Sequence, residues 1–475
     1  MEIIETDALA RFYRQRGFDT RFQTGTDEHG VKLQKTAAEL NKTPAQICDK
    51  NSAKFHALRD TLNLSFDDFI RTSDQKRHWP AAQKMWHELA MAGKLEKRKY
   101  YGKYCAGCEE FKNEKDLIEG KCSIHKNTPE EIEEENWFFR LSDYSSEILE
   151  ILESKRVEIV PEFRAKEILN IVREGLHDIS FSRPRKSLQW GIPVPNDDSQ
   201  TMYVWCDALT NYISAIGYTE ENAEFQKWWP ANVHVIGKDI VRFHAGIWLG
   251  MLLAAKLPLP QKIFVHGFIT SEGHKMSKSL GNVINPTEIV EKWGTDALRY
   301  YLLSEIPIGQ DGDFSRKRFC EVYNSTLANG LGNLVSRVVA MALKSQDKSF
   351  EIKELEKTGE IESEKMWTEL ESSMQDFDFR HALMSIFGLV EWSNKFITEV
   401  KPWTKENPEQ QKILGTLLEI IRQIALALTP FLPETSAKIL VSLGVENSDS
   451  FTKLHRWGSS ASFKLSKTSI LFPKK

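Results

Sequence analysis

The stretch Thr24-Gly25-Thr26-Asp27-Glu28-His29-Gly30 decides the fold, because it joins a predicted strand to a predicted helix. An extended run at residues 18–23 precedes it, and residues 31–40 have the apolar spacing of a helix. Polar and acidic residues in this place are typical of the carboxyl edge of a doubly wound α/β sheet, where such folds bind ligands. A βα loop that binds nothing would have the same composition.

Upstream, residues 2–16 are predicted to form an amphipathic helix, with Ile4, Ala8 and Phe12 on one stripe and Gly17 as its stop. Downstream, residues 96–200 interrupt the α/β rhythm. It resumes with a strand-like run at 202–205 and a helix to residue 216. The remaining predicted elements are a strand at 233–236, a helix at 240–255 and a strand at 262–266. Past residue 325 the pattern is entirely helical, which predicts a bundle.

The predicted fold class is therefore α/β: a doubly wound parallel sheet of Rossmann type with an insertion and a C-terminal all-α bundle. The predicted boundaries are 1–95 and 201–266 for the two halves of the sheet domain, 96–200 for the insertion, 267–325 for a Gly/Ser/Lys loop with short helices, and 326–475 for the bundle.

Composition excludes several classes of protein. The 475 residues are 41% hydrophobic and carry 63 basic and 67 acidic side chains, for a net charge of −4. So many apolar residues with balanced charge exclude a disordered chain. The longest uncharged apolar stretch, residues 247–255, is far short of the roughly 20 residues of a membrane span. The first residues lack the features of a signal peptide, so we expect a cytoplasmic protein.

The pattern Cys105-x2-Cys108-x13-Cys122-x2-His125 predicts one structural Zn²⁺. Two close pairs of soft ligands can meet at a tetrahedral ion with no open position for chemistry. The other interpretation is a chance grouping of buried thiols. The remaining cysteines have no such spacing and are most simply small buried apolar side chains.

A second segment, Lys275-Met276-Ser277-Lys278-Ser279-Leu280-Gly281-Asn282, has the residues of a phosphate-binding loop. Lysine ammonium groups suit a phosphate chain, and a mobile loop can bring them to a developing negative charge. On composition alone, such a loop is usually only solvated.

The sequence Lys275-Met276-Ser277-Lys278-Ser279 resembles the second signature of class I aminoacyl-tRNA synthetases. Nearly the whole chain is similar to the methionyl-tRNA synthetase family of the bacterial type with a single zinc knuckle. The matching segments, in order, are 24–30, the four zinc ligands, Trp190-Gly191-Ile192-Pro193-Val194-Pro195, Tyr203-Val204-Trp205-Cys206-Asp207-Ala208, Gly237-Lys238-Asp239-Ile240, Phe243-His244 and Val265-His266-Gly267.

The resemblance implies that methionine attacks the α-phosphorus of ATP, with Mg²⁺ on the phosphates, and that the methionyl group then passes to tRNA(Met). It implies that Lys278 stabilises the transition state and that Lys275 assists. The ATP-binding residues it implies are Lys275, Ser277, Lys278, Gly237, Asp239 and His266.

For the amino acid, the resemblance implies that Asp27 takes the ammonium group, while Trp205, Ala208, Tyr212 and His244 surround the side chain. Trp205 and Tyr212 lie seven residues apart, so they share a helix face, and aromatic rings favour a thioether. Without the resemblance, both would be better explained as core aromatics.

For tRNA, the resemblance implies an anticodon reader made of Asn333, Arg337 and Trp403. Asn333 and Arg337 are i,i+4 neighbours, and an aromatic ring can stack on an unpaired base. Without the resemblance, we would assign them to a solvated helix face and a cap on the bundle core. We expect a monomer rather than a homodimer.

One family signature, His-x-Gly-His, occurs nowhere in the chain. The helix that follows it in the family corresponds to residues 2–16, so the sequence predicts that residues 1–475 alone do not form methionyl-adenylate. One alternative is a tRNA-binding relative without catalysis. Another is a class I synthetase for a different apolar amino acid, although the 96–200 insertion is too short for the editing domain of those enzymes.

Overall fold

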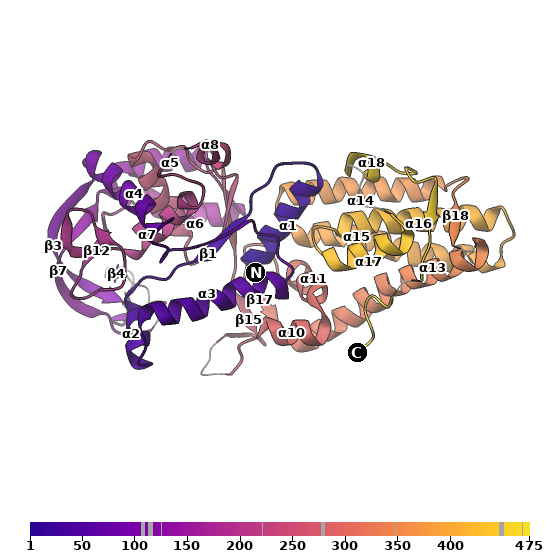
Figure 1. Ribbon diagram of the computed structural model, residues 1–475, viewed down its shortest axis with the longest axis horizontal. Coiled ribbons are helices and arrows are strands. Elements are labelled where there is room, and N and C mark those ends of the chain that lie inside the picture. Colours follow the sequence, from indigo (N-terminus) through magenta and orange to yellow (C-terminus); the bar gives the residue numbers. More distant parts are fainter. Residues whose placement is uncertain are drawn as a thin grey trace. The chain divides into compact units, whose positions relative to one another are not determined.

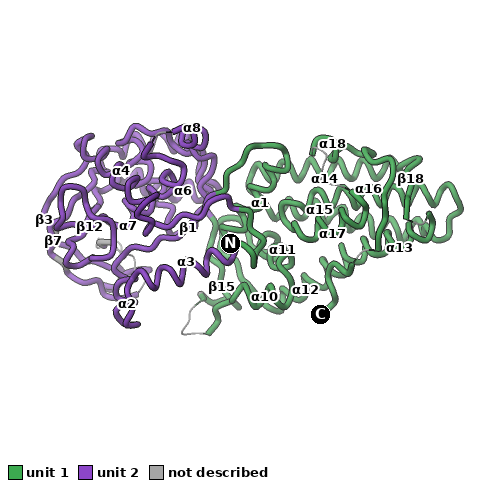
Figure 2. Tube along the Cα trace, in the orientation of Figure 1, with its two compact units in different colours: residues 1–22, 59–65, 266–475 green, residues 23–58, 66–265 purple. Residues whose placement is uncertain are grey.

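The computed structural model describes residues 1–105, 110–112, 117–124, 126–220, 222–276, 281–346, 348–445, 451–467 and 469–475. The chain forms two compact units (Figure 2). Unit 1 comprises residues 1–22, 59–65 and 266–475, and unit 2 comprises residues 23–58 and 66–265. The chain therefore passes between the units four times. The domain boundaries expected from the sequence remain predictions.

Unit 2 contains the parallel strands of the α/β fold (Figure 1). Strand β1 (Gln23–Thr26) pairs in parallel with β2 (Asp68–Arg71), and β14 (Lys262–His266) lies between β13 (Val233–Gly237) and β8 (Glu158–Val160). Among the described residues no ladder joins β1 to β13, so the sheet consists of two pieces. The expected α/β class and the strand at 262–266 are confirmed.

The first strand begins later than predicted. Residues 18–22 form no regular structure, and β1 starts only at Gln23. Their backbone is engaged elsewhere, since the Arg14 guanidinium donates to the carbonyl of Thr20. Once formed, β1 packs tightly, because a Cβ at Gly25 would lie 2.0 Å from the carbonyl oxygen of Ile70 in β2.

Helices flank these strands in unit 2. They are α2 (Val31–Glu39), α3 (Pro44–Thr61), α4 (Trp79–Met91), η2 (Leu141–Tyr144), α5 (Ser145–Glu153), α6 (Glu162–Arg173), α7 (Val204–Ser214), α8 (Ala223–Trp228), η3 (Phe243–Trp248) and α9 (Leu249–Ala254). The last residues of α3, from Arg59 on, belong to unit 1. Two predictions need correction. The prediction of a strand at 202–205 is wrong, because α7 begins at Val204. The predicted single helix at 240–255 is instead a π-helix, η3, followed by α9.

The predicted insertion consists largely of antiparallel strands. Strand β3 (Leu95–Cys105) pairs along its length with β7 (Glu130–Phe139), which contains the acidic run of the sequence. Lys99 lies opposite Glu135 and Lys103 opposite Glu131, so opposite charges face each other across the ladder and stabilise the pairing. The remaining strands are β4 (Glu110–Lys112), β5 (Leu117–Ile118), β6 (Lys121–Cys122), β9 (Ile179–Ser180), β10 (Ser182–Pro184), β11 (Pro193–Val194) and β12 (Asp197–Met202).

Unit 1 is mostly helical, as predicted for the C-terminal bundle, and α14, α15, α16 and α17 lie side by side in it (Figure 1). Its helices are α1 (Glu2–Gln15), α10 (Pro286–Trp293), α11 (Thr295–Glu305), α12 (Arg316–Val322), η5 (Tyr323–Gly332), α13 (Asn333–Gln346), α14 (Lys357–Gln375), α15 (Phe379–Val400), η6 (Pro402–Thr404), α16 (Glu409–Leu428), α17 (Pro433–Leu443) and α18 (Phe451–His455). Its strands are β15 (Ile269–Ser271), β16 (His274–Lys275), β17 (Gly312–Phe314), β18 (Ser349–Glu351) and β19 (Ser462–Lys464).

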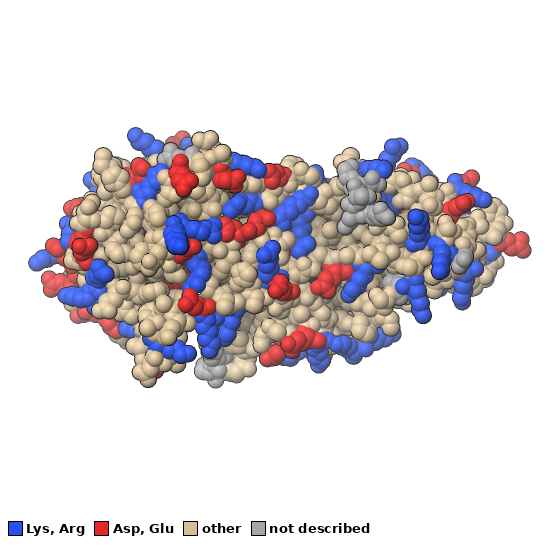
Figure 3. All heavy atoms as spheres, in the orientation of Figure 1, with Lys and Arg blue, Asp and Glu red and all other residues tan. Residues whose placement is uncertain are grey.

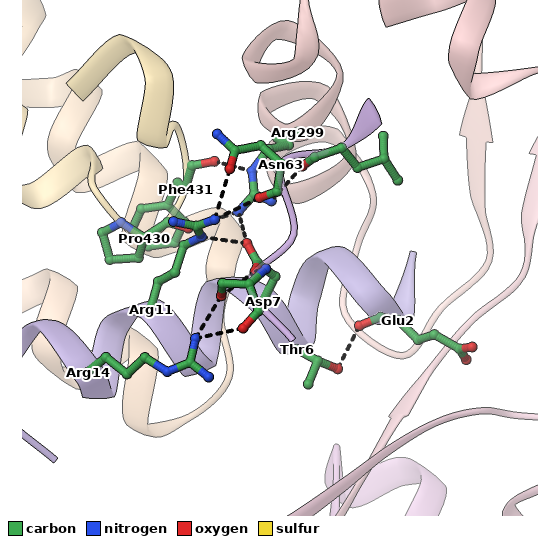
Figure 4. Close-up of polar contacts among 11 residues, drawn as sticks. Glu2, Thr6, Asp7, Arg11, Arg14, Asn63, Arg299, Pro430 and Phe431 are labelled. Atoms are coloured by element: carbon green, nitrogen blue, oxygen red, sulfur yellow. Dashed lines mark hydrogen bonds and ion pairs between the residues drawn. The ribbon is translucent and has the colours of Figure 1, made fainter. Parts of the chain in front are cut away.

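A buried ion pair ties α1 into unit 1 (Figure 4). The Asp7 carboxylate accepts from Arg299 at 2.7 Å, from Arg11 at 2.8 Å and from the Ser65 backbone N–H at 2.6 Å. The Arg299 guanidinium also donates to the carbonyl of Phe431 at 2.8 Å. Both charged side chains are fully buried. Their hydrogen bonds therefore join the first helix, the 59–65 segment and the bundle.

Surface charge is mixed in sign. On the face drawn in Figure 3, Lys and Arg side chains are interspersed with Asp and Glu side chains, in keeping with the small net charge. None of the helices described here has the length and apolar character needed to cross a membrane.

Glu5 in α1 predicts a pH-dependent stability. Its side chain is 2% exposed, and burial raises its pKa from 4.5 to about 7, against a smaller opposing effect of His266. Between these values the unfolded chain releases a proton that the folded chain retains, so stability falls as pH rises from about 4.5 to about 7. We expect Glu5→Gln to remove this loss, worth at most about 3 kcal/mol.

Urea unfolding at several pH values between 4.5 and 8 measures this effect. The matched control is Glu364→Gln, which alters an exposed carboxylate on α14. An identical pH profile for Glu5→Gln and the unmodified protein would contradict the assignment.

Candidate active site

Helix α7 supplies one wall of the candidate pocket. Its start is fixed by extended backbone at Tyr203 and by Asp207 in its first turn, where a carboxylate is favoured by the helix dipole. Three of the residues predicted from the sequence, Trp205, Ala208 and Tyr212, lie at i, i+3 and i+7, so they share one face of this helix.

The structure brings His244 of η3 to this face. The Nδ1 of His244 lies 2.9 Å from the carbonyl oxygen of Ile240, so it carries the proton and donates. Its Nε2 therefore accepts from the Tyr212 hydroxyl, 2.6 Å away. Beside them, the Trp205 ring stacks on Phe243 with 4.0 Å between ring centroids. The pocket thus combines aromatic surface with a polar pair of defined direction.

Three residues of this pocket were missed from the sequence: Trp229, His234 and Trp248. The Tyr212 ring lies 4.2 Å from that of His234, and Trp248 donates its indole N–H to the His234 Nε2 at 3.2 Å. Burial, aided by His244, lowers the pKa of His234 to about 3. A histidine inside the apolar strand β13 was the available sequence signal, as was a tryptophan one helical turn after His244.

The loop after β1 is held by its polar residues. The Glu28 carboxylate accepts from Arg71 Nε at 2.8 Å and from the hydroxyls of Thr26 and Ser73. His29 contacts Asp207 of α7 at 2.5 Å. Asp27, which was predicted to take an ammonium group, is exposed on this loop. The structure therefore links the predicted ammonium-binding residue to the predicted side-chain pocket through the residue two positions after it.

The predicted ATP-binding residues fall on both units. In unit 2, Gly237 is the buried last residue of β13, and Asp239 is exposed in the turn that follows, as expected for the carboxyl end of a parallel strand. In unit 1, His266 contacts the carbonyl oxygen of Gly267 at 2.7 Å and Glu2 at 3.1 Å. Burial lowers the pKa of His266, but its hydrogen bond to Glu2 and the nearby Glu5 raise it on balance.

The predicted signature loop is described only in part. Lys275 belongs to β16, which pairs with β15 in an antiparallel hairpin. Ser277 and Lys278 lie outside the described residues. The catalytic roles of Lys275 and Lys278 therefore remain predictions.

Two of the four predicted zinc ligands are described. Cys105 and Cys122 are fully buried at the ends of β3 and β6, and neither forms a disulfide. Asn127 links them, since its side chain accepts from Cys105 at 3.4 Å and its carbonyl accepts from the Cys122 N–H at 2.8 Å. Cys108 and His125 lie outside the described residues, and the described ones contain no complete group of metal ligands.

The predicted RNA-reading residues form a compact surface in unit 1. Asn333 is exposed at the start of α13, and Arg337 follows one turn later. The Arg337 guanidinium lies 5.0 Å from the ring centre of Trp403 in η6, and that ring is 52% exposed. An exposed ring beside a guanidinium and an amide suits an unpaired base.

Comparisons with known proteins agree with this arrangement. A family model described as tRNA synthetases class I (M) matches residues 1–116 and 106–339, and one for the anticodon binding domain of methionyl tRNA ligase matches residues 349–462. A methionine–tRNA ligase of Caldanaerobacter subterraneus is 42% identical over 93% of this chain and 70% of its own length. One of Brucella suis is 40% identical over 94% of this chain and 88% of its own length.

Among solved structures, methionyl-tRNA synthetase of Mycobacterium tuberculosis bound by methionyl-adenylate matches with a TM-score of 0.95 and 35% identity, covering 99% of this chain and 96% of that one. Parallel α/β strands, a helical bundle and the two matching family models define a class I aminoacyl-tRNA synthetase. Within that class, the chain belongs to the methionyl-tRNA synthetase family, the methionine–tRNA ligases.

The His234 environment gives a prediction for this pocket. Because its pKa is lowered to about 3, we expect its imidazole to remain neutral from pH 7.5 to 4.5. Proton–nitrogen NMR of histidine-labelled protein measures this, with His234→Gln used to assign the resonance. A ring that becomes protonated above pH 5 would contradict the buried contact with Trp248.

Proposed function

We propose that this chain binds L-methionine, ATP and tRNA(Met). Together with the His-x-Gly-His signature of its family, it would form methionyl-adenylate and transfer the methionyl group to the tRNA. The observation that carries the proposal is the pocket on α7 and η3, in which a hydrogen-bonded Tyr212–His244 pair stands among aromatic rings. Such a surface suits a linear thioether, because sulfur makes favourable contacts with aromatic rings. The similar methionyl-tRNA synthetase of Mycobacterium tuberculosis, which is bound by methionyl-adenylate, supports the same ligand.

In the first step, a methionine carboxylate oxygen bonds to the α-phosphorus of ATP while the bond from that phosphorus to the bridging oxygen breaks and pyrophosphate leaves. We propose that Asp27 holds the ammonium group through a charge-assisted hydrogen bond. Trp205, Ala208, Tyr212 and His244 would enclose the side chain. In the second step, a hydroxyl of the 3′-terminal ribose attacks the acyl carbon and AMP leaves.

For ATP, we propose that Gly237, Asp239 and His266 contact the nucleotide, with Mg²⁺ neutralising its phosphates. Lys275, Ser277 and Lys278 would bind the phosphates, and Lys278 would place positive charge where the transition state gains negative charge. For tRNA, we propose that Asn333, Arg337 and Trp403 read the anticodon. The Arg337–Trp403 contact supports this, because it preorganises a stacking surface.

We propose a structural Zn²⁺ held by Cys105, Cys108, Cys122 and His125. The fit rests on two fully buried cysteines that Asn127 holds near each other: its side chain accepts from the Cys105 thiol, and its carbonyl accepts from the Cys122 backbone N–H. Thiolate and imidazole are the ligands that zinc prefers, and such an ion would stabilise the β5–β6 region rather than take part in the reaction. None of the described cysteines forms a disulfide, which suits the cytoplasmic location that we propose. We also propose that the enzyme is a monomer.

Methionine-dependent exchange of labelled pyrophosphate into ATP tests the proposed activity. It is measured with residues 1–475 alone and with this chain preceded by a strand and a His-x-Gly-His signature from a relative. We expect exchange by the extended protein, background rates for residues 1–475 alone, and a loss of roughly 10²-fold or more in the extended Lys278→Ala variant.

Exchange driven by leucine or isoleucine instead of methionine would indicate a synthetase for another amino acid. Binding of tRNA without exchange by either protein would indicate a non-catalytic relative.

Metal analysis tests the zinc site independently of activity. We expect one zinc ion per purified chain and less than about a tenth of that in Cys105→Ser, because three ligands bind zinc far more weakly than four. Cys206→Ser is the matched control, since Cys206 is an equally buried thiol in α7. Zinc-free unmodified protein after purification with added zinc would contradict the proposal.

A further inference from the structure

A buried cluster of two imidazoles and one carboxylate lies behind the candidate pocket in unit 2. The Asp207 carboxylate contacts His29 Nδ1 through one oxygen at 2.5 Å and His78 Nε2 through the other at 2.6 Å. All three side chains are at most 2% exposed. They come from three separate elements: the loop after β1, the N-terminus of α4 and the first turn of α7.

The hydrogen bonds define the direction of each contact. The partner of both imidazoles is an ionised carboxylate, whose oxygens only accept, so His78 donates from Nε2 and His29 from Nδ1. The other ring nitrogen of His78, Nδ1, lies 3.0 Å from the Ser214 hydroxyl and 3.2 Å from the side-chain amide nitrogen of Asn211. Asp207 thus accepts one N–H on each oxygen.

Asp207 is suited to remain ionised in this place. Burial by itself would raise its pKa, but the charge and hydrogen bond of His29 and those of His78 lower it on balance. A buried carboxylate is tolerated only when such partners compensate it. Loss of either donor would leave the other contact intact but free one oxygen of the carboxylate.

The loop after β1 is consequently held by the contacts of two neighbouring residues, Glu28 and His29. On one side, Glu28 is bonded to Arg71, and its carbonyl accepts from the Trp190 indole at 2.5 Å. On the other side, His29 is bonded to α7, and its ring packs edge-on against Trp190 with 5.4 Å between centroids. Asp27 precedes this clamped pair directly. Its backbone position is therefore restrained by the contacts of the two residues that follow it, one of which is a bond to α7.

We infer that Asp207 and His29 are positioning residues that fix the Asp27 carboxylate relative to the side-chain pocket on α7. Asp207 lies two residues after Trp205 and next to Ala208, and His29 lies two residues after Asp27. One hydrogen bond thus sets the separation between the group proposed to hold the ammonium and the surface proposed to hold the thioether. This inference rests on the proposed function, and it assigns to Asp207 a role in selecting an α-amino acid.

Paired ligands test the inference. L-Methionine and its deaminated analogue γ-methylthiobutyrate share the thioether and the carboxylate and differ only in the ammonium group. Their dissociation constants are measured by titration calorimetry with the full 475-residue chain. We expect the unmodified protein to prefer methionine by roughly 30-fold or more, as for one well-placed charge-assisted contact. In Asp207→Asn and His29→Leu we expect that preference to fall below about five-fold, while γ-methylthiobutyrate binds with unchanged affinity.

Conservative variants separate positioning from simple destabilisation. His29→Asn keeps a donor near the place of Nδ1 and should restore most of the preference for methionine, whereas His29→Leu should not. His56→Leu is the matched control, because it alters an exposed histidine of unit 2 outside the cluster. Equal weakening of both ligands would indicate a structural role only, and an unchanged preference in His29→Leu would overturn the inference. If the unmodified protein binds neither ligand, the proposed function itself fails.

Discussion

The buried Asp7–Arg299 ion pair is the interaction on which unit 1 depends. It is fully desolvated, and each partner has further hydrogen bonds, so the attraction is not opposed by unpaired polar groups. Removing one partner of such a pair typically costs about 3–5 kcal/mol, a large part of the roughly 5–15 kcal/mol that stabilises a native protein in total. The hydrogen bonds of this pair connect α1, the 59–65 segment and the bundle.

Unit 2 also contains a buried carboxylate, Asp207, that is bonded to side chains from other segments. Asp207 also joins three distant segments of chain, but its neighbours on α7 line the candidate pocket. Because α7 carries both the buried carboxylate and the pocket residues, the helix that stabilises the site also shapes it. The hydrogen-bonded pair Tyr212–His244 places polar groups at one position of this otherwise aromatic surface.

Much of this could be read from the sequence, and the failures have physical causes. Spacing alone located α1, α2, β14 and the long bundle helices, because each buries one regular apolar face. It did not identify the acidic residues of β7 as a strand, since that strand depends on lysines of β3 about 30 positions away. The residues of the Asp207 cluster were missed for the same reason: His29, His78 and Asp207 are ordinary polar residues until the fold brings them together. The Tyr212–His244 pair was found because a resemblance named both residues, whereas Trp229 and His234 had no such pointer.

The four crossings between units affect how the protein is made. Arg299 leaves the ribosome about 290 residues after Asp7, which at 5–20 residues per second is a delay of roughly 15–60 s. During that time α1 exposes an apolar face and a carboxylate whose partner has not yet been synthesised. Unit 2 can complete its core first, because all of its residues are synthesised before the helical bundle of unit 1. The order of synthesis therefore makes α1 one of the last helices to reach its native contacts.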